Sequence, residues 1–231
     1  MKSIQIKEGE GLGKIKIIEQ EIPVPAAGEI RVRWHATSLN YHDYMVAKGL
    51  LPTEEGRVPM SDGAGEIDAV GGDVSRWKKG DKVMSLFFPK WQHGAPRIET
   101  TRFISGETID GYATEYSVLP ANAVTAMPED YSYTAAATLP CAGLTAWRAL
   151  VVEGQIKSGD SVLIEGTGGM SIFALQFARM AGAQVFATTG SNEKIEQLKA
   201  MGATEVLNYK EDPKWEKHFL KKPAGSTTLL M

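Results

Sequence analysis

The segment Ser161-Val162-Leu163-Ile164-Glu165-Gly166-Thr167-Gly168-Gly169-Met170-Ser171 decides the fold of the second half of the chain. Its apolar start predicts a buried strand, and its glycines predict a tight turn into a helix. Gly166 stands where a glycine bends the chain, and Gly168 where one lets a diphosphate approach the backbone. Small Ser171 stands where a third glycine is usual. Free amides at the helix start then predict a diphosphate site, and the alternative is a flexible glycine loop.

Strand and helix patterns repeat after this turn. Residues 169–181 predict a helix, with a buried face expected to carry Met170, Phe173, Ala174, Phe177 and Ala181. Strands are predicted at 184–189 and 205–209, with a helix at 192–201 between them. This β-α-β-α-β order is the opening half of a doubly wound parallel sheet. Only residues 210–231 follow, fewer than the roughly 30 that a further unit needs, and we interpret the last ten or so as foreign to the fold.

The first half of the chain has the texture of short strands and turns. Strict alternation at 30–36 predicts a strand with one apolar face. Further strands are predicted at 4–7, 15–18, 63–70 and 82–88. Short strands at this spacing indicate a small, partly closed β-barrel.

The pattern changes near residue 130, because residues 133–152 are rich in Ala and Leu and predict a helix interrupted around Pro140. We therefore predict an α/β chain with two domains. A barrel domain is expected at 1–130, and an incomplete doubly wound dinucleotide-binding domain at 131–231.

Composition excludes several classes of protein. The 231 residues are 43% hydrophobic and 23% charged with a net charge of −3, which argues for a globular protein and against nucleic acid as a partner. No stretch reaches the roughly 20 apolar residues that span a bilayer, and the N-terminus lacks a signal peptide, so no membrane association is expected. The single cysteine, Cys141, excludes an internal disulfide. We expect a cytoplasmic protein.

The end of the second predicted strand bears on the choice of coenzyme. An NAD enzyme places Asp or Glu there, about 20 residues beyond the glycines, to hold the ribose 2′-hydroxyl. Here the sequence reads Thr189-Gly190-Ser191-Asn192, with no carboxylate before Glu193. Hydroxyls and amides suit a 2′-phosphate, and Lys194 in the first helical turn would neutralise it, so NADP is predicted. The alternative for Lys194 is a lysine that points into solvent.

Five motifs, in order over residues 1 to about 215, carry a family resemblance. They are Thr37-Ser38-Leu39-Asn40-Tyr41-His42-Asp43, Ser61-Asp62-Gly63-Ala64-Gly65-Glu66, Gly80-Asp81-Lys82-Val83, Thr138-Leu139-Pro140-Cys141-Ala142-Gly143-Leu144-Thr145-Ala146-Trp147 and Gly166-Thr167-Gly168-Gly169. With these motifs the chain resembles the zinc-independent quinone oxidoreductase branch of the medium-chain dehydrogenase/reductase superfamily. The resemblance implies a GroES-like barrel followed by a Rossmann domain.

The resemblance also bears on zinc. In zinc-dependent relatives a Cys follows the first barrel strand and a Gly-His-Glu precedes the Gly-rich strand, whereas this chain has Asn40 and Ser61-Asp62 at those places. Cys141 matches a third ligand position, and one thiol cannot hold a catalytic zinc, which needs three protein ligands. We predict no metal, and we favour a packing role for Cys141.

The resemblance assigns residues to the site. Asn40 and Tyr41 are similar to the family's polar pair beside the nicotinamide, which implies that they orient substrate and that Tyr41 donates a proton. Coenzyme contacts are implied for Thr145, Gly166, Thr167, Gly168, Gly169, Met170, Thr189, Gly190, Ser191, Lys194 and Tyr209. The segment Phe87–Trp91 is a candidate wall for an apolar substrate, or else part of the barrel core, and residues 92–110 are a polar loop and candidate lid.

The predicted function is transfer of a hydride from NADPH to a small quinone or activated alkene or carbonyl compound, without zinc. One alternative is a truncated, inactive fragment with at most weak nucleotide or partner binding, since an incomplete sheet leaves an unpaired edge. Another is a zinc-free alcohol dehydrogenase-like activity. The resemblance also implies a homodimer, formed in the family through the C-terminal part of the nucleotide domain that we expect to be incomplete here.

Overall fold

The computed structural model describes residues 1–7, 11–220 and 228–230. The chain divides into two compact units, Met1–Cys141 and Ala142–Met231. The predicted boundary at residue 130 lies before this division. The difference arises because α3 (Tyr133–Ala136) still belongs to the barrel unit, where Ala136 and Ala137 are buried with Ala64 and Met84.

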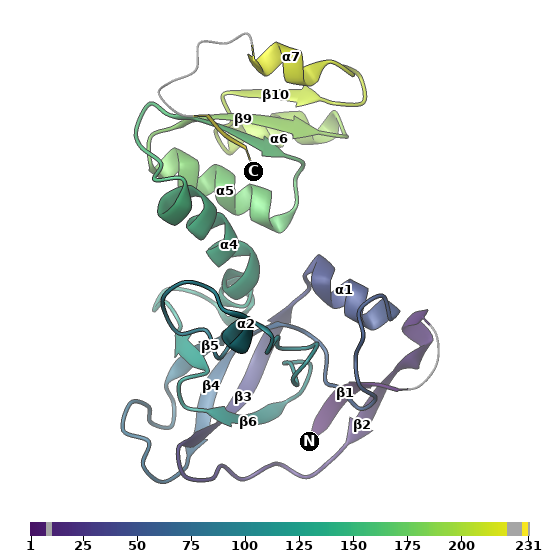
Figure 1. Cartoon of the computed structure of the whole chain (residues 1–231), viewed down its shortest axis with the longest axis vertical. Coiled ribbons are helices and arrows are strands. Elements are labelled where there is room, and N and C mark those ends of the chain that lie inside the picture. Colours follow the sequence, from purple (N-terminus) through teal and green to yellow (C-terminus); the bar gives the residue numbers. More distant parts are fainter. Residues whose placement is uncertain (8–10, 221–227, 231) are drawn as a thin grey trace. The chain divides into compact units, whose positions relative to one another are not determined.

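The first unit is built from two antiparallel sheets (Figure 1). The small sheet pairs β1 (Lys2–Ile6) with β2 (Ile15–Glu19). The larger sheet has the order β6-β3-β4-β5-β7. Its strands are β3 (Glu29–Ser38), β4 (Asp62–Val70), β5 (Lys82–Ser85), β6 (Tyr116–Pro120) and β7 (Val124–Ala126). Besides α3, the same unit contains α1 (Tyr41–Lys48) and α2 (Ile98–Thr101).

Alternation along β3 places its apolar side chains in the barrel core. Ile30 and Val32 are fully buried and Trp34 is 8% exposed, as the strict period of two predicts. Burying side chains of this size contributes about 1.5–3 kcal/mol each. The strand predicted at 82–88 ends earlier, at Ser85, because β5 pairs with its neighbours only as far as that residue.

A broken helical segment runs from the last residues of the first unit into the second. It consists of a π-helical turn at Leu139–Gly143, α4 (Leu144–Trp147) and a further π-helical stretch, Arg148–Glu153. The irregularity falls where Pro140, which has no N–H to donate, interrupts the α-helical ladder, so the predicted interruption is confirmed.

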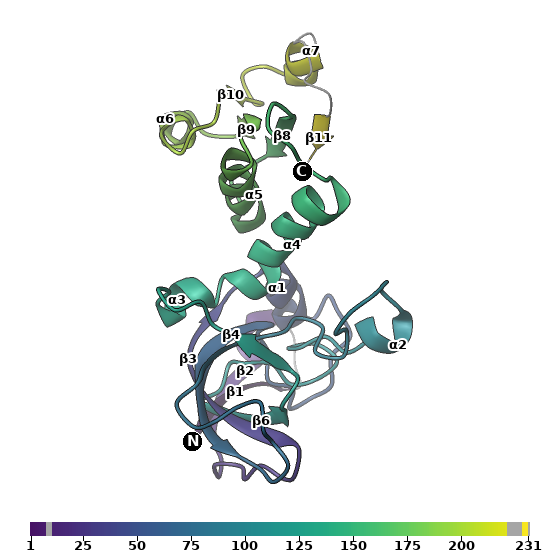
Figure 2. The same ribbon diagram turned by 90° about the vertical axis from the view of Figure 1, so that its left-hand side faces the viewer.

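The alternating strands and helices of the second unit follow this segment. They are β8 (Ser161–Glu165), α5 (Gly169–Met180), β9 (Gln184–Thr189), α6 (Glu193–Ala200), β10 (Glu205–Asn208), α7 (Trp215–Leu220) and β11 (Thr228–Leu230). The described strands form one parallel sheet with the order β10-β9-β8-β11. Figure 2 shows α5 and α6 on one side of these strands and α7 on the other. This is the predicted doubly wound arrangement.

The buried face of α5 differs from the prediction. The residues that the helix buries are Ser171, Ala174, Leu175 and Ala178. Only Ala174 was expected among them, whereas Phe173 and Phe177 flank the core and are partly buried. The helix therefore presents its smaller side chains to the sheet, which allows close helix–strand packing, and the large rings stack beside the contact with centroids 6.0 Å apart.

The C-terminal residues also depart from the prediction. Thr228–Leu230 was expected to lie outside the fold, but it forms β11 and pairs in parallel with β8 from Ser161 to Leu163. The error arose because three residues are too short for a recognisable period, and only pairing with β8 defines them as a strand. Residues 221–227 and 231, which belong to the same predicted tail, lie outside the described residues. The strand order reverses at β8, and the rule for open α/β sheets places a ligand at such a switch point, beyond the carboxyl ends of the strands.

Candidate functional site

The glycine turn at the end of β8 is shaped to receive an anion. Gly166 has a left-handed φ of 76° and bends the chain, while its N–H donates to the carbonyl of Thr188 at 3.1 Å. Gly168 is the N-cap of α5 in an extended conformation, and its own side-chain position is open, with no atom within 4 Å. The first amides of a helix have no partner within it, so the N–H groups at the start of α5 are available to a bound phosphate.

Ser171 performs the packing expected of a third glycine. Its side chain is 6% exposed, and its hydroxyl donates to the carbonyl of Glu165 at 3.0 Å. The hydroxyl is therefore satisfied inside the helix–strand contact, which removes the cost of burying it. Ala142 lies beside the same turn, since a Cβ at Gly169 would be 3.5 Å from the Cβ of Ala142. Thr145, one helical turn further on, is exposed on α4.

Predicted coenzyme residues from β9 and α6 gather at the same edge of the sheet. Lys194 extends from the first turn of α6 and its ammonium donates to the Thr167 hydroxyl at 3.0 Å. The Thr189 hydroxyl accepts from the backbone N–H of Ser191 at 3.2 Å and shapes the turn after β9. Lys194 is therefore directed toward the glycine turn, as a phosphate ligand requires, although its side chain is also exposed to solvent.

Tyr209 covers the turn after β9. Its N–H donates to the Thr189 carbonyl at 3.1 Å, and a Cβ at Gly190 would lie 2.6 Å from its hydroxyl. Sequence reasoning missed two further residues here, Lys210 and Glu211, because they follow the third strand and come near Gly190 and Asn192 only through the sheet. Their charge beside Tyr209 was the one signal that could have drawn attention to them.

A buried polar network surrounds Asn40 in the first unit. The Asn40 side-chain amide donates to Asp62 Oδ2 at 2.8 Å and to Ser61 Oγ at 3.1 Å. Asp43 accepts from the backbone N–H groups of Asn40 and Ser61, each at 2.8 Å. Asp43 is 2% exposed and Asp62 is fully buried, so the network holds two carboxyl groups away from water. It fixes the loop that leads from β3 into α1.

Asp62 has an unusual environment within this network. Its Oδ1 is buried without a hydrogen-bond partner. Burial, opposed by the Asn40 hydrogen bond and reinforced by the charge of Asp43, raises the pKa of Asp62 to about 7. Burial and the same two carboxylates raise the pKa of the Cys141 thiol to about 12, so this thiol stays protonated. A protonated thiol is a weak nucleophile, which agrees with the packing role predicted for Cys141.

Tyr41 begins α1 and presents its ring to solvent. The side chain is 76% exposed and lies 5.9 Å, centroid to centroid, from the ring of Tyr44. The structure thus gives the two predicted catalytic residues different settings. Asn40 has both of its amide protons committed to the network, whereas the Tyr41 ring is accessible.

His42 links α1 to the loop at 105–109. Its Nε2 lies 2.6 Å from Glu107 Oε2, and its Nδ1 lies 3.7 Å from Asp43 Oδ1. Asp43, and then Glu107, raise the pKa of His42 above 6.5 against the opposing effect of burial. His42 is therefore hydrogen-bonded to Glu107, which ties the polar loop to the barrel, whereas Asp43 lies beyond hydrogen-bond distance of Nδ1 and acts on the ring by its charge.

Replacing His42 with Gln is expected to destabilise the chain by about 1–2 kcal/mol at pH 5.5 and by less at pH 9. The folded pKa of His42 is raised, so its stabilisation is complete below 6.5 and is lost as pH rises through the folded value. Urea unfolding at the two pH values measures the difference, with exposed His93→Gln as the control. An equal loss at both pH values would contradict the assignment.

The predicted aromatic wall forms a continuous series of rings. Phe87 meets His42 edge-on at 5.3 Å, Phe88 meets Phe87 at 4.7 Å, and Trp91 lies 6.0 Å from Phe88, all between centroids. All four rings are partly buried. The series of rings thus starts at α1, next to Tyr41. This position suits both roles predicted for Phe87–Trp91, a wall for an apolar substrate and a part of the barrel core.

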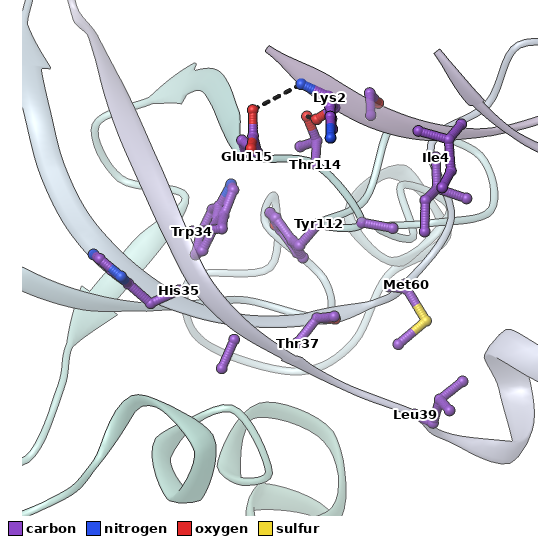
Figure 3. Close-up of a pocket in the computed structure, with 14 residues that line it drawn as sticks. Lys2, Ile4, Trp34, His35, Thr37, Leu39, Met60, Tyr112, Thr114 and Glu115 are labelled. Atoms are coloured by element: carbon purple, nitrogen blue, oxygen red, sulfur yellow. Dashed lines mark hydrogen bonds between the residues drawn. The ribbon is translucent and has the colours of Figure 1, made fainter. Parts of the chain in front are cut away.

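A separate pocket of about 560 Å³ is lined in part by residues of β3 (Figure 3). Its wall is mainly apolar, and Lys2 and Glu115 meet at its rim through a 2.7 Å hydrogen bond from the Lys2 backbone N–H. The labelled apolar side chains that face it include Ile4, Trp34, Leu39 and Met60. None of the predicted site residues lines this pocket.

Among residues 1–7, 11–220 and 228–230, no three His, Cys, Asp or Glu side chains gather as they would around a metal ion. In the same ranges, no helix combines the length and the apolar character needed to cross a bilayer.

Comparisons with known protein families agree with the two-unit architecture. The alcohol dehydrogenase GroES-like domain family matches residues 26–129, and the zinc-binding dehydrogenase family matches residues 169–227. A zinc-type alcohol dehydrogenase-like protein of Schizosaccharomyces pombe is 45% identical over 94% of this chain, and the match covers 64% of that protein. A chloroplast envelope quinone oxidoreductase homolog of Arabidopsis thaliana is 32% identical over 94% of this chain and 62% of its own length.

Solved structures extend the comparison. A putative alcohol dehydrogenase from Sinorhizobium meliloti shares 37% identity and superimposes with a TM-score of 0.86, over 95% of this chain and 67% of that one. The chain spans less than two thirds of the length of the two curated relatives named above. The glycine turn, the barrel and these matches together show that the chain belongs to the medium-chain dehydrogenase/reductase superfamily.

Proposed function

We propose that this chain carries the coenzyme turn and the catalytic loop of an NADPH-dependent, zinc-independent oxidoreductase that reduces a quinone or an activated alkene. The observation that carries the coenzyme choice is the 3.0 Å contact between the Lys194 ammonium and the Thr167 hydroxyl. It brings a cation from α6, the helix that follows β9, to the glycine turn, whereas an NAD enzyme has a carboxylate at the end of the second strand.

The residues of the turn fit a dinucleotide. The open side-chain position at Gly168 leaves room for a diphosphate beside the backbone, and the amides that begin α5 supply donors. Thr189, Gly190 and Ser191 would line the ribose, and Tyr209 would flank the adenosine end. Thr145 and Met170 belong to the same proposed set through the family resemblance.

The proposed zinc independence rests on the chemistry of the residues that stand where zinc-dependent relatives have their metal ligands. Asn40 and Ser61 are bound to each other, and Asp62 is bound to Asn40, so these side chains satisfy one another. An amide, a hydroxyl, one thiol and a carboxyl group that already accepts from Asn40 are a poor donor set for Zn²⁺, whose catalytic sites are built mainly from thiolate and imidazole. The named zinc-type relative and the name of the matching family make this a point to test by metal analysis.

The proposed hydride acceptors follow from the proposed zinc independence, because such an enzyme has no metal ion to act as a Lewis acid. Hydride addition to a simple carbonyl concentrates charge on one oxygen, which ordinarily demands a metal or a strong acid. A quinone or enone spreads that charge, so a hydroxyl donor suffices. When bound, NADPH supplies the hydride. Tyr41, exposed at the start of α1, would donate the proton, and Asn40, held by Asp62 and Ser61, would position the loop that carries Tyr41.

Coenzyme titration tests the proposal. We expect NADPH to bind at least about tenfold more tightly than NADH, since one charge-assisted contact to the 2′-phosphate contributes about 1.5 kcal/mol or more. Lys194→Ala should remove most of this preference. Lys199→Ala, on the same helix but paired with Glu196, is the matched control and should leave it unchanged. If Lys194→Ala kept the preference for NADPH over NADH, Lys194 would not be the residue that selects the coenzyme.

The alternatives have their own readouts. A truncated, inactive fragment would show no rise in thermal stability on addition of NADPH, because a ligand stabilises a fold only by binding it. A zinc-free alcohol dehydrogenase would oxidise NADPH with a simple ketone as readily as with a quinone or an enone. Comparing the three acceptors therefore separates the second alternative from the proposal.

A further inference from the structure

The turn after β10 lies against the turn after β9, within the second unit. Gly190 packs under the ring of Tyr209, and a Cβ placed there would also lie 3.2 Å from Cε of Lys210. A side-chain ladder connects the two turns, because Asn208 Nδ2 donates to Asn192 Oδ1 at 2.7 Å and Asn192 Nδ2 lies 2.5 Å from Glu211 Oε1. The sheet therefore brings two adjacent, oppositely charged residues, Lys210 and Glu211, to the ends of β9 and α6.

These two side chains face the place where the proposed 2′-phosphate would lie. Lys210 lies beside Gly190, whereas Lys194 contacts Thr167 of the glycine turn. Glu211 is bound to Asn192, the residue that caps α6 two positions before Lys194. Glu211 thus supplies, from beyond β10, a carboxylate near the position that Asp or Glu takes at the end of the second strand in NAD enzymes.

We propose that Lys210 and Glu211 set the coenzyme preference in opposite directions. Lys210 would favour NADPH by attracting the 2′-phosphate, and Glu211 would disfavour it by repulsion while it accepts from the ribose hydroxyls of NADH. This inference rests on the proposed function, because it concerns the coenzyme of the same site. It predicts that the preference for NADPH is moderate and can be tuned in both directions.

The expected effects follow from the exposure of the two groups. Both side chains reach solvent, so salt and water screen their charge. Single charges of this kind alter affinity by roughly 3- to 10-fold at low salt, and by less at high salt. A dianionic phosphate feels both charges more strongly than a neutral ribose does, so the ratio of the NADPH and NADH dissociation constants is the quantity to measure.

The experiment uses the whole chain with Lys210→Met and Glu211→Gln. Titrations with NADPH and NADH, followed by coenzyme fluorescence at low and high salt, give both dissociation constants. We expect Lys210→Met to lower the NADPH preference about 3- to 10-fold and Glu211→Gln to raise it by a similar factor. Gln keeps an oxygen for Asn192, so the ladder remains. Lys214→Met and Glu216→Gln, which neutralise exposed charges further along the chain, are the matched controls.

Opposite shifts in the two variants, larger at low salt, would support the inference, because a structural disturbance gives no reason for opposite signs. Shifts in the same direction, or ratios equal to those of the controls, would overturn it. The proposed function fails separately, if the unmodified chain shows no preference for NADPH or if Lys194→Ala leaves the preference intact. Absence of binding by either coenzyme would overturn both.

Discussion

Replacing Asp62 with Asn is expected to stabilise the chain by about 3 kcal/mol at pH 8 and to leave its stability nearly unchanged at pH 4. Asp62 is fully buried beneath Asn40 and one of its oxygens has no partner. Ionising this carboxyl group in the folded chain removes a charge from water and so costs free energy, whereas the unfolded chain ionises it in water without that cost. Asn has nearly the same shape and carries no charge, so it removes the cost and keeps an oxygen for Asn40.

The direction with pH follows from the raised pKa of Asp62. Below 3.8 the carboxyl group is protonated in both the folded and the unfolded chain, and its ionisation costs nothing. Between 3.8 and about 7 the unfolded chain releases the proton and the folded chain holds it, so stability falls as pH rises. Above about 7 both states are ionised and the loss is complete. The advantage of the Asn variant should therefore grow over this interval.

Urea unfolding followed by tryptophan fluorescence between pH 4 and pH 8 measures this difference. Asp43→Asn is the matched control, since Asp43 is also buried but accepts from two backbone N–H groups. Asn at position 43 has one acceptor oxygen in place of two, so one backbone N–H loses its partner and the chain should be destabilised by about 1–3 kcal/mol at every pH. An Asp62→Asn variant that is less stable than the original chain at pH 8, or equally shifted at pH 4, would contradict the prediction.

Replacing Gly168 with Val is expected to weaken NADPH binding by about 100-fold or more while the fold remains intact. Gly168 has an ordinary φ of −71°, and no atom lies within 4 Å of the position of a Cβ, so the folded chain has room for the side chain. That room is the space proposed for the diphosphate. The valine side chain would occupy it and hold the ligand away from the amides of α5.

Thermal denaturation with and without NADPH reports both effects in one experiment. Without coenzyme, the Val variant should melt within a few degrees of the original chain, and with coenzyme only the original chain should gain stability. Gly159→Ala offers a contrast, because Gly159 has a φ of 88° and the change should cost stability without touching the coenzyme turn. Undiminished binding by the Val variant would place the diphosphate elsewhere.

The strand–turn–helix unit could be predicted because the residues that form it are neighbours in the chain. The apolar run that becomes β8, the left-handed Gly166 and the small Ser171 each specify their own local conformation. The alternation in β3 is equally local. For α5, however, the periodicity predicted the buried face only in part, since Phe173 and Phe177 pack at the edge of the core while Ala174 and Ala178 are fully buried. Several faces of that helix are apolar, and only contact with the sheet selects one.

Sequence by itself thus determined the fold class and the glycine turn, and it predicted most of the residues that we propose for the coenzyme site. Tertiary structure alone decided that Asn40 is bound to Asp62, that Glu211 reaches Asn192, and that Thr228–Leu230 is a strand. The reason is physical. Local patterns record which side of a strand or helix avoids water, whereas hydrogen bonds between distant residues, and the pKa of a buried carboxyl group, depend on the register in which the strands pair.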